Sequence, residues 1–148
     1  MIPPVAAVMQ NLAISLMTEI GPQVQPEYQQ KSLTLLAMLL LMAGEEWDRS
    51  VARRVEENAE LRRIFGAAAA CVDDDALRAR LEKAASEADE GLLVSDLDRS
   101  NDALRGLLIA LHERVESLDT DEARRIEAEI WSELCASTER RKISASVF

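Results

Sequence analysis

The chain has no glycine or proline between Pro26 and Gly44, and its apolar pattern continues past Gly44 to about Phe65. Since glycine and proline are the usual helix breakers, the sequence predicts one helix over about 26–65. A helix of about 40 residues spans about 60 Å at 1.5 Å per residue. A kink near Gly44 is the alternative to a continuous helix.

The rest of the chain also has helical periodicity. Apolar residues spaced three and four apart predict further helices over about 5–20, 77–88, 97–118 and 123–134. We therefore expect an all-α fold, a four- or five-helix bundle with one long central helix. Residues 1–148 are expected to form a single helical-bundle domain, with a frayed tail over 139–148.

Polar residues at the predicted helix starts indicate how three of these helices begin. The third helix can be capped by Asp73, Asp74 or Asp75, whose negative charges are favourable at the positive end of the helix dipole. Ser95 or Ser100 can cap the fourth. The fifth can start either at Thr120 alone or at a capping box formed by Asp119 and Glu122.

The charge balance argues against several classes of partner. The formal net charge is −10, from 27 acidic and 17 basic residues, and the short basic clusters lie among acids. A protein that binds a phosphate backbone needs clustered lysine and arginine, so we expect no nucleic-acid partner. The first ten residues, MIPPVAAVMQ, have no basic region or cleavage site, so we expect no secretory signal, and Cys71 and Cys135 have no metal or redox spacing. We expect a cytoplasmic protein with buried, reduced thiols and no cofactor.

The nine apolar residues from Leu35 to Ala43 do not predict a membrane span. As a helix they cover about 14 Å, whereas the hydrocarbon core of a bilayer is about 30 Å thick. Lys31 and Glu45 closely bound the apolar run.

No catalytic or metal-binding set emerges from the sequence. A ferritin-like di-iron bundle needs two Glu-x-x-His pairs, but His112 is the sole histidine. Nothing marks His112 as a general base, because no nucleophile for it to activate is evident. The acids that follow the apolar run diverge around the helix, so an all-carboxylate cation site is not expected there. We predict a non-enzymatic protein without metal ligands.

The first half of the long helix is apolar on two sides. One line, which contains Leu33, Ala37, Leu40, Gly44 and Trp47, is expected to face the core. The opposite side carries the line Leu35, Met38 and Met42.

A helix that is apolar all round needs cover all round. The first and fifth helices could supply that cover. A second copy of the chain, related by a two-fold axis, is the other source, and we expect this homodimer. The candidate interface is Leu35, Met38, Leu39 and Met42. Alternatively, the same four residues could line a pocket for an acyl chain or similar ligand.

Two asparagines fall in apolar lines, Asn58 in the long helix and Asn101 in the fourth. An asparagine in an apolar seam costs stability but can specify register or partner. If the two met, they would satisfy each other as a buried amide pair. Asn58→Leu should then raise thermal stability, unless Asn58 belongs to a fuller polar network, in which case it should cost several kcal/mol.

The run MAGEEWDRSVARRVEENAELRRIF, residues 42–65, resembles uncharacterised bacterial all-helical proteins that occur near genes for acyl-CoA dehydrogenases and small-molecule phosphotransferases. The resemblance implies an accessory role and transfers no active-site residue. We therefore expect a helical interaction protein, a homodimer that acts with a metabolic enzyme. The alternative is a carrier of a small apolar or acyl ligand.

Overall fold

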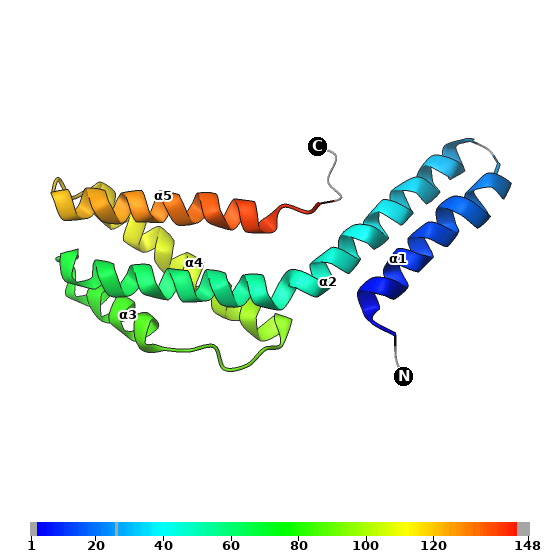
Figure 1. The fold of residues 1–148 in the computed structure, drawn as a ribbon. Coiled ribbons are helices and arrows are strands. Elements are labelled where there is room, and N and C mark those ends of the chain that lie inside the picture. Colours follow the sequence, from blue (N-terminus) through cyan, green and yellow to red (C-terminus); the bar gives the residue numbers. More distant parts are fainter. Residues whose placement is uncertain (1–2, 26, 145–148) are drawn as a thin grey trace. The chain divides into compact units, whose positions relative to one another are not determined.

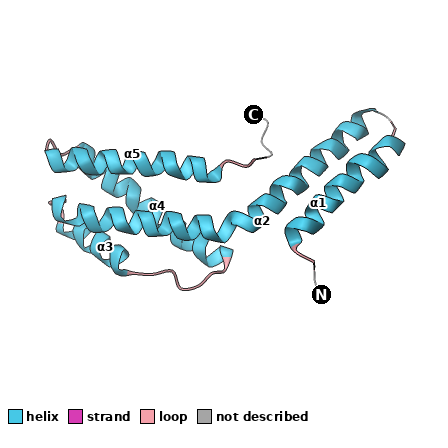
Figure 2. Cartoon of the chain, in the orientation of Figure 1, coloured by secondary structure: helices cyan, strands magenta, loops and turns pink. Residues whose placement is uncertain are grey.

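A computed structural model describes residues 3–25 and 27–144, and all regular secondary structure in them is helical (Figures 1 and 2). The α-helices are α1 (Val5–Ser15), α2 (Glu27–Ala68), α3 (Asp75–Ser86), α4 (Val94–Glu116) and α5 (Asp121–Arg141). A π-helical turn, Leu16–Ile20, and a 3₁₀ turn, Gly21–Gln23, follow α1, and a second 3₁₀ turn, Ala69–Cys71, follows α2. The predicted all-α fold is confirmed.

The long helix is also confirmed. Helix α2 has 42 residues and is continuous through Gly44. Neither α2 nor any other helix in the described ranges is both long enough and apolar enough to cross a membrane. This agrees with the expectation from the short apolar run.

The chain divides into two compact units. Unit 1 comprises residues 1–50 and 142–148, and unit 2 comprises 51–141, so α2 contributes its first half to unit 1 and its second half to unit 2. Whether the two units form the predicted single domain stays a prediction. In the predicted tail, α5 is helical through Arg141, and residues 145–148 lie outside the described residues.

Unit 2 packs the second half of α2 with α3, α4 and α5 around a core of large apolar side chains. Ile64, Phe65, Leu81, Leu111 and Ile130 are all 0 % exposed. At about 1.5–3 kcal/mol for each fully buried side chain of this size, this cluster is the main stabilising feature of the unit.

Two of the predicted caps are present in unit 2. The Asp74 carboxylate accepts hydrogen bonds from the Ala76 and Leu77 amides at 2.9 and 3.0 Å. The Thr120 hydroxyl accepts one from the Ala123 amide at 3.1 Å, so Thr120 caps α5.

The predicted cap of α4 is wrong. Helix α4 begins at Val94, before both candidate serines, and has no side-chain cap. Ser100 lies inside the helix, where its hydroxyl instead donates a hydrogen bond to the Asp89 carboxylate at 2.9 Å.

Unit 1 is a helical hairpin in which the first half of α2 runs antiparallel to α1 (Figure 1). The contact is made by small residues: Ala13 and Ala37 are 2 % and 3 % exposed. A Cβ atom added to Gly44 would lie 3.4 Å from the Met9 Cβ and 3.5 Å from the Ala6 carbonyl oxygen. The two backbones therefore approach closely at Gly44.

The prediction that Trp47 faces the core is wrong, because Trp47 is 61 % exposed. The first turn of α1 already faces Gly44, and α1 begins at Val5. Trp47 lies one turn beyond Gly44 in α2, so α1 does not extend far enough to cover it.

Gly44→Ala should raise the free energy of unfolding by up to about 1 kcal/mol. Alanine is the better helix former by about 0.5–1 kcal/mol, and its methyl group fits in ordinary contact with Met9. Gly44→Leu should instead cost about 1–3 kcal/mol, since the larger side chain overfills the contact with α1. Denaturant unfolding followed by circular dichroism measures both changes.

Gly106→Ala is the control, because an added Cβ there has no neighbour within 4 Å and reports helix propensity alone. A Gly44→Leu protein as stable as the wild type would contradict the close contact between α1 and α2.

Candidate functional site

The first candidate site is the apolar surface of unit 1. The buried residues among the described part of this unit are all small: Ala13, Ala37, Gly44 and Ser50. Large apolar residues are exposed on both of its helices and on the turns between them, by 37–68 % each. They are Val8, Leu12, Ile14, Met17, Ile20, Tyr28, Leu35, Leu36, Leu39, Leu41 and Trp47.

The four predicted interface residues lie on the side of α2 away from α1. Leu35 is 57 % and Leu39 is 49 % exposed, while Met38 and Met42 are half-buried. At about 100° per residue, all four are about 100–160° from Ala37, which faces α1. The structure thus brings the four residues onto one face of the helix.

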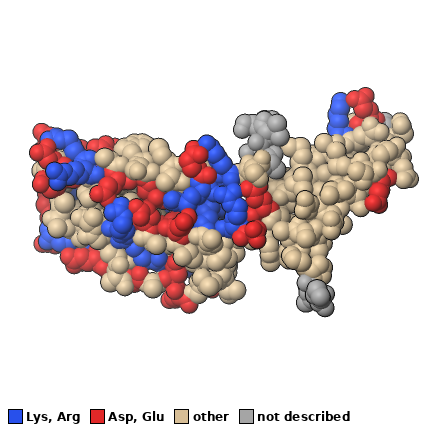
Figure 3. All heavy atoms as spheres, viewed as in Figure 1, with Lys and Arg blue, Asp and Glu red and all other residues tan. Residues whose placement is uncertain are grey.

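This surface carries almost no charge. Of the 17 basic and 27 acidic residues of the chain, only Glu19, Glu27 and Lys31 lie before Glu45. Figure 3 shows the surface formed by α1 and the first half of α2 as nearly continuous uncharged atoms, whereas acids and bases are interspersed over unit 2. An apolar patch of this kind is often a site of association.

Glu45 ends the apolar stretch and binds the residues after α5. Its carboxylate accepts hydrogen bonds from the Ser144 amide at 2.9 Å and the Ser144 hydroxyl at 2.6 Å. It also pairs with Arg49, one turn further along α2, at 2.7 Å. The Ser144 hydroxyl, the Ser144 amide and Arg49 together lower the pKa of Glu45 from 4.5 to about 2.

Ser144→Ala should raise the pKa of Glu45 from about 2 part of the way to 4.5, since the substitution removes the hydroxyl but leaves the backbone amide of residue 144 and the Arg49 contact. Because the folded state lowers this pKa, the contribution of Glu45 to stability is complete above pH 4.5 and is lost as the pH falls toward 2. NMR titration of the Glu45 carboxyl carbon measures the shift. Ser95→Ala, at an exposed serine far along the chain, should leave it unchanged.

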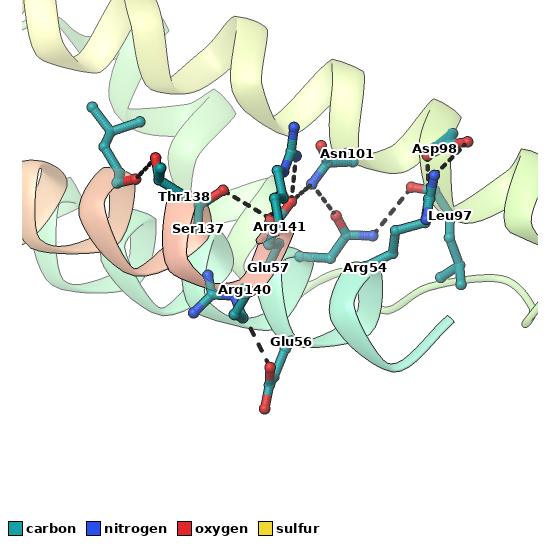
Figure 4. A network of polar contacts seen from close by, with 12 residues as sticks. Arg54, Glu56, Glu57, Leu97, Asp98, Asn101, Ser137, Thr138, Arg140 and Arg141 are labelled. Carbon is teal, nitrogen blue, oxygen red and sulfur yellow. Dashed lines mark hydrogen bonds and ion pairs between the residues drawn. The ribbon is translucent and has the colours of Figure 1, made fainter. Parts of the chain in front are cut away.

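The second candidate site is a buried polar network in unit 2, centred on Glu57 of α2 (Figure 4). Glu57 is 2 % exposed. Arg141 donates to both of its carboxylate oxygens, at 3.0 and 2.7 Å, in the bidentate geometry that favours such pairs. The Ser137 hydroxyl donates at 2.8 Å and the Asn101 amide at 3.4 Å.

The two predicted asparagines meet beside Glu57. Asn58 is 0 % and Asn101 is 6 % exposed, and the Asn101 amide nitrogen donates to the Asn58 side-chain oxygen at 2.9 Å. The Asn58 amide nitrogen in turn donates to Asp89 at 3.0 Å and to the Leu97 carbonyl oxygen at 3.4 Å. The pair is therefore part of a larger network.

Asp89, in the segment between α3 and α4, joins this network to Arg62. One carboxylate oxygen of Asp89 accepts hydrogen bonds from Asn58, from Arg62 at 2.8 Å and from Ser100 at 2.9 Å. Burial raises the pKa of Asp89, but the hydrogen bonds from Arg62 and Ser100 outweigh burial and leave it lowered.

Burial acts differently on the two most buried glutamates. It opposes ionisation of Glu57, yet the hydrogen bonds from Arg141 and Ser137 hold the pKa of Glu57 below its ordinary value. At Glu133, which pairs with Arg140, burial dominates and raises the pKa. The network thus holds an ionised Glu57 against Arg141, an arrangement that can specify helix register.

Sequence reasoning missed most of this network. Asn58 and Asn101 were found because they interrupt apolar lines. Glu57 sits next to Asn58 in a charged run, where a solvent-exposed acid is the ordinary expectation. Its partners Ser137 and Arg141 lie 80 and 84 residues away, so no local pattern could reveal them.

Asn58→Leu should lower the free energy of unfolding by about 1–3 kcal/mol, because Asp89 loses one of its three donors and the Asn101 amide keeps only its 3.4 Å contact with Glu57. The network therefore favours this outcome over the gain expected for an isolated asparagine. A double-mutant cycle of Asn58→Ala and Asn101→Ala should give a coupling energy of about 0.5–3 kcal/mol in denaturant unfolding. A coupling near zero, or a more stable Asn58→Leu protein, would contradict the amide pair.

Comparisons of the chain with protein-family models, with curated proteins and with solved structures each found no match.

Proposed function

We propose that this protein is a non-enzymatic helical assembly protein. It forms a homodimer through unit 1 and acts as an accessory to a metabolic enzyme.

The support for an assembly role is the lack of a core of large residues in unit 1. Its buried described residues are alanine, glycine and serine, whereas eleven large apolar residues are exposed. A two-helix hairpin with one small-residue contact cannot enclose so much apolar surface. A second hairpin would complete the arrangement as a four-helix bundle.

The exposed apolar area is of the size that a stable dimer needs. Full burial of one large apolar side chain is worth about 1.5–3 kcal/mol, and the eleven side chains are each about half exposed. Burying their exposed halves would therefore contribute about 10 kcal/mol of hydrophobic free energy. At 25 cal/mol per Å², this corresponds to about 400 Å² of apolar surface in each chain. A standard interface takes about 500 Å² of apolar surface from each partner.

A second copy is favoured over a charged partner surface because this face offers almost no charge to pair with. Two identical uncharged faces meet without burying an unpaired ion. Met38 and Met42 add adaptable side chains to the face. The metabolic enzyme as a further partner follows from the resemblance of residues 42–65 described above.

Leu35→Lys and Leu39→Lys should each weaken dimerisation at least about tenfold, because burying one leucine is worth about 1.5–3 kcal/mol. Sedimentation equilibrium of the wild type should give twice the chain mass, and the double variant should sediment as a monomer. Circular dichroism checks that its helices remain.

Ile109→Lys is the matched control, since Ile109 is 70 % exposed in unit 2 and lies outside the proposed interface. A wild-type monomer over the accessible concentration range would contradict the dimer. Native mass spectrometry of the purified protein is the second measurement, and a co-purified lipid bound to a monomer would favour the ligand-carrier alternative.

A further inference from the structure

His112 of α4 has an unusual environment in unit 2. Its ring meets that of Trp131 of α5 edge to face, with 5.4 Å between the centroids and an interplanar angle of 84°. The His112 side chain is 22 % exposed, but its Nε2 atom is buried and has no hydrogen-bond partner among the described residues. A buried nitrogen that can form a hydrogen bond is seldom left without a partner.

Two carboxylates lie beside that nitrogen. Glu116, one turn later in α4, places Oε1 at 3.4 Å from His112 Nε2. Glu127 comes from α5, and one ligand atom from each of the three residues lies within 4.8 Å of the other two.

The two carboxylates also lack the counter-charge that three acids in the interior of unit 2 have. Glu57, Asp89 and Glu133 each pair with an arginine. Within the described part of the chain, neither Glu116 nor Glu127 forms an ion pair with a lysine or arginine. Two neighbouring carboxylates beside an imidazole nitrogen form a set of donors that favours a bound cation.

The geometry points to one divalent transition-metal ion, of the zinc class, bound by His112 Nε2 and by the Glu116 and Glu127 carboxylates. Two atoms bound about 2.1 Å from one zinc ion at the tetrahedral angle lie about 3.4 Å apart. The separation of His112 Nε2 and Glu116 Oε1 is 3.4 Å. The i, i+4 spacing within α4 is the spacing at which two ligands on one helix can share a zinc ion.

The donor set selects the class of metal. An imidazole nitrogen suits zinc, copper, iron or nickel, whereas calcium and magnesium prefer sites made of oxygen alone. Three protein ligands leave a further position for water. This site would tie α4 to α5 within unit 2, and it is independent of the proposed dimer, which uses residues of unit 1.

Titration of the full-length protein with Zn²⁺, in competition with a chelating dye, tests the site. The Cys135→Ser background removes the exposed thiol as a competing ligand. We expect one ion per chain. His112→Gln and Glu127→Gln should each weaken Zn²⁺ binding at least about a hundredfold, because loss of a supporting residue alone costs 10–100-fold.

Glu113→Gln is the matched control, since Glu113 is an exposed acid on the same helix and should leave the affinity unchanged. Co²⁺ provides a local readout: it should quench the fluorescence of Trp131, which contacts His112, and His112→Gln should abolish this quenching. Trp131→Phe assigns the signal, and circular dichroism confirms that the variants fold.

Absence of stoichiometric Zn²⁺ binding, or equal affinity in the His112→Gln and Glu127→Gln proteins, would overturn the metal site. Neither result bears on the dimer, whose test is the mass of the Leu35→Lys/Leu39→Lys protein.

Discussion

The burial of the Glu57 carboxylate is the constraint on which unit 2 depends. An ion taken out of water must find compensating partners, and here they come from two other helices, Asn101 from α4 and Ser137 and Arg141 from α5. Moving either of these helices by one turn would break hydrogen bonds to Glu57. Apolar packing of Leu, Ile and Phe tolerates such shifts more easily. The polar contacts therefore specify the register of the helices, while apolar burial supplies most of the stability.

Unit 1 is built on the opposite principle. Its internal contact is a seam of alanine and glycine, which brings two backbones close together but buries little area. Many of its large apolar side chains are exposed, and only Glu19, Glu27 and Lys31 are charged before Glu45. The buried acids of unit 2 pair with arginines of the same unit, whereas unit 1 exposes large apolar side chains. This contrast is the physical basis for the proposal that association uses unit 1.

Much of the fold could be predicted because it depends on local rules. The long helix, the Asp74 cap and the apolar lines of α4 and α5 each follow from residues a few positions apart. The outward position of Trp47 could not, because it depends on where α1 begins relative to a distant turn of α2. The pairing of His112 with Glu127 likewise requires α4 and α5 to be placed side by side.

The sequence by itself determined that the chain is helical, that α2 is long, and that its first half is apolar on both sides. It also marked Asn58 and Asn101 as polar residues in apolar lines. Only the tertiary structure decided what meets them: the two asparagines join Glu57, Asp89 and Arg62, and α1 covers just one side of α2. Helix periodicity is a property of neighbours in the chain, whereas contacts across 30–80 residues depend on how the helices pack.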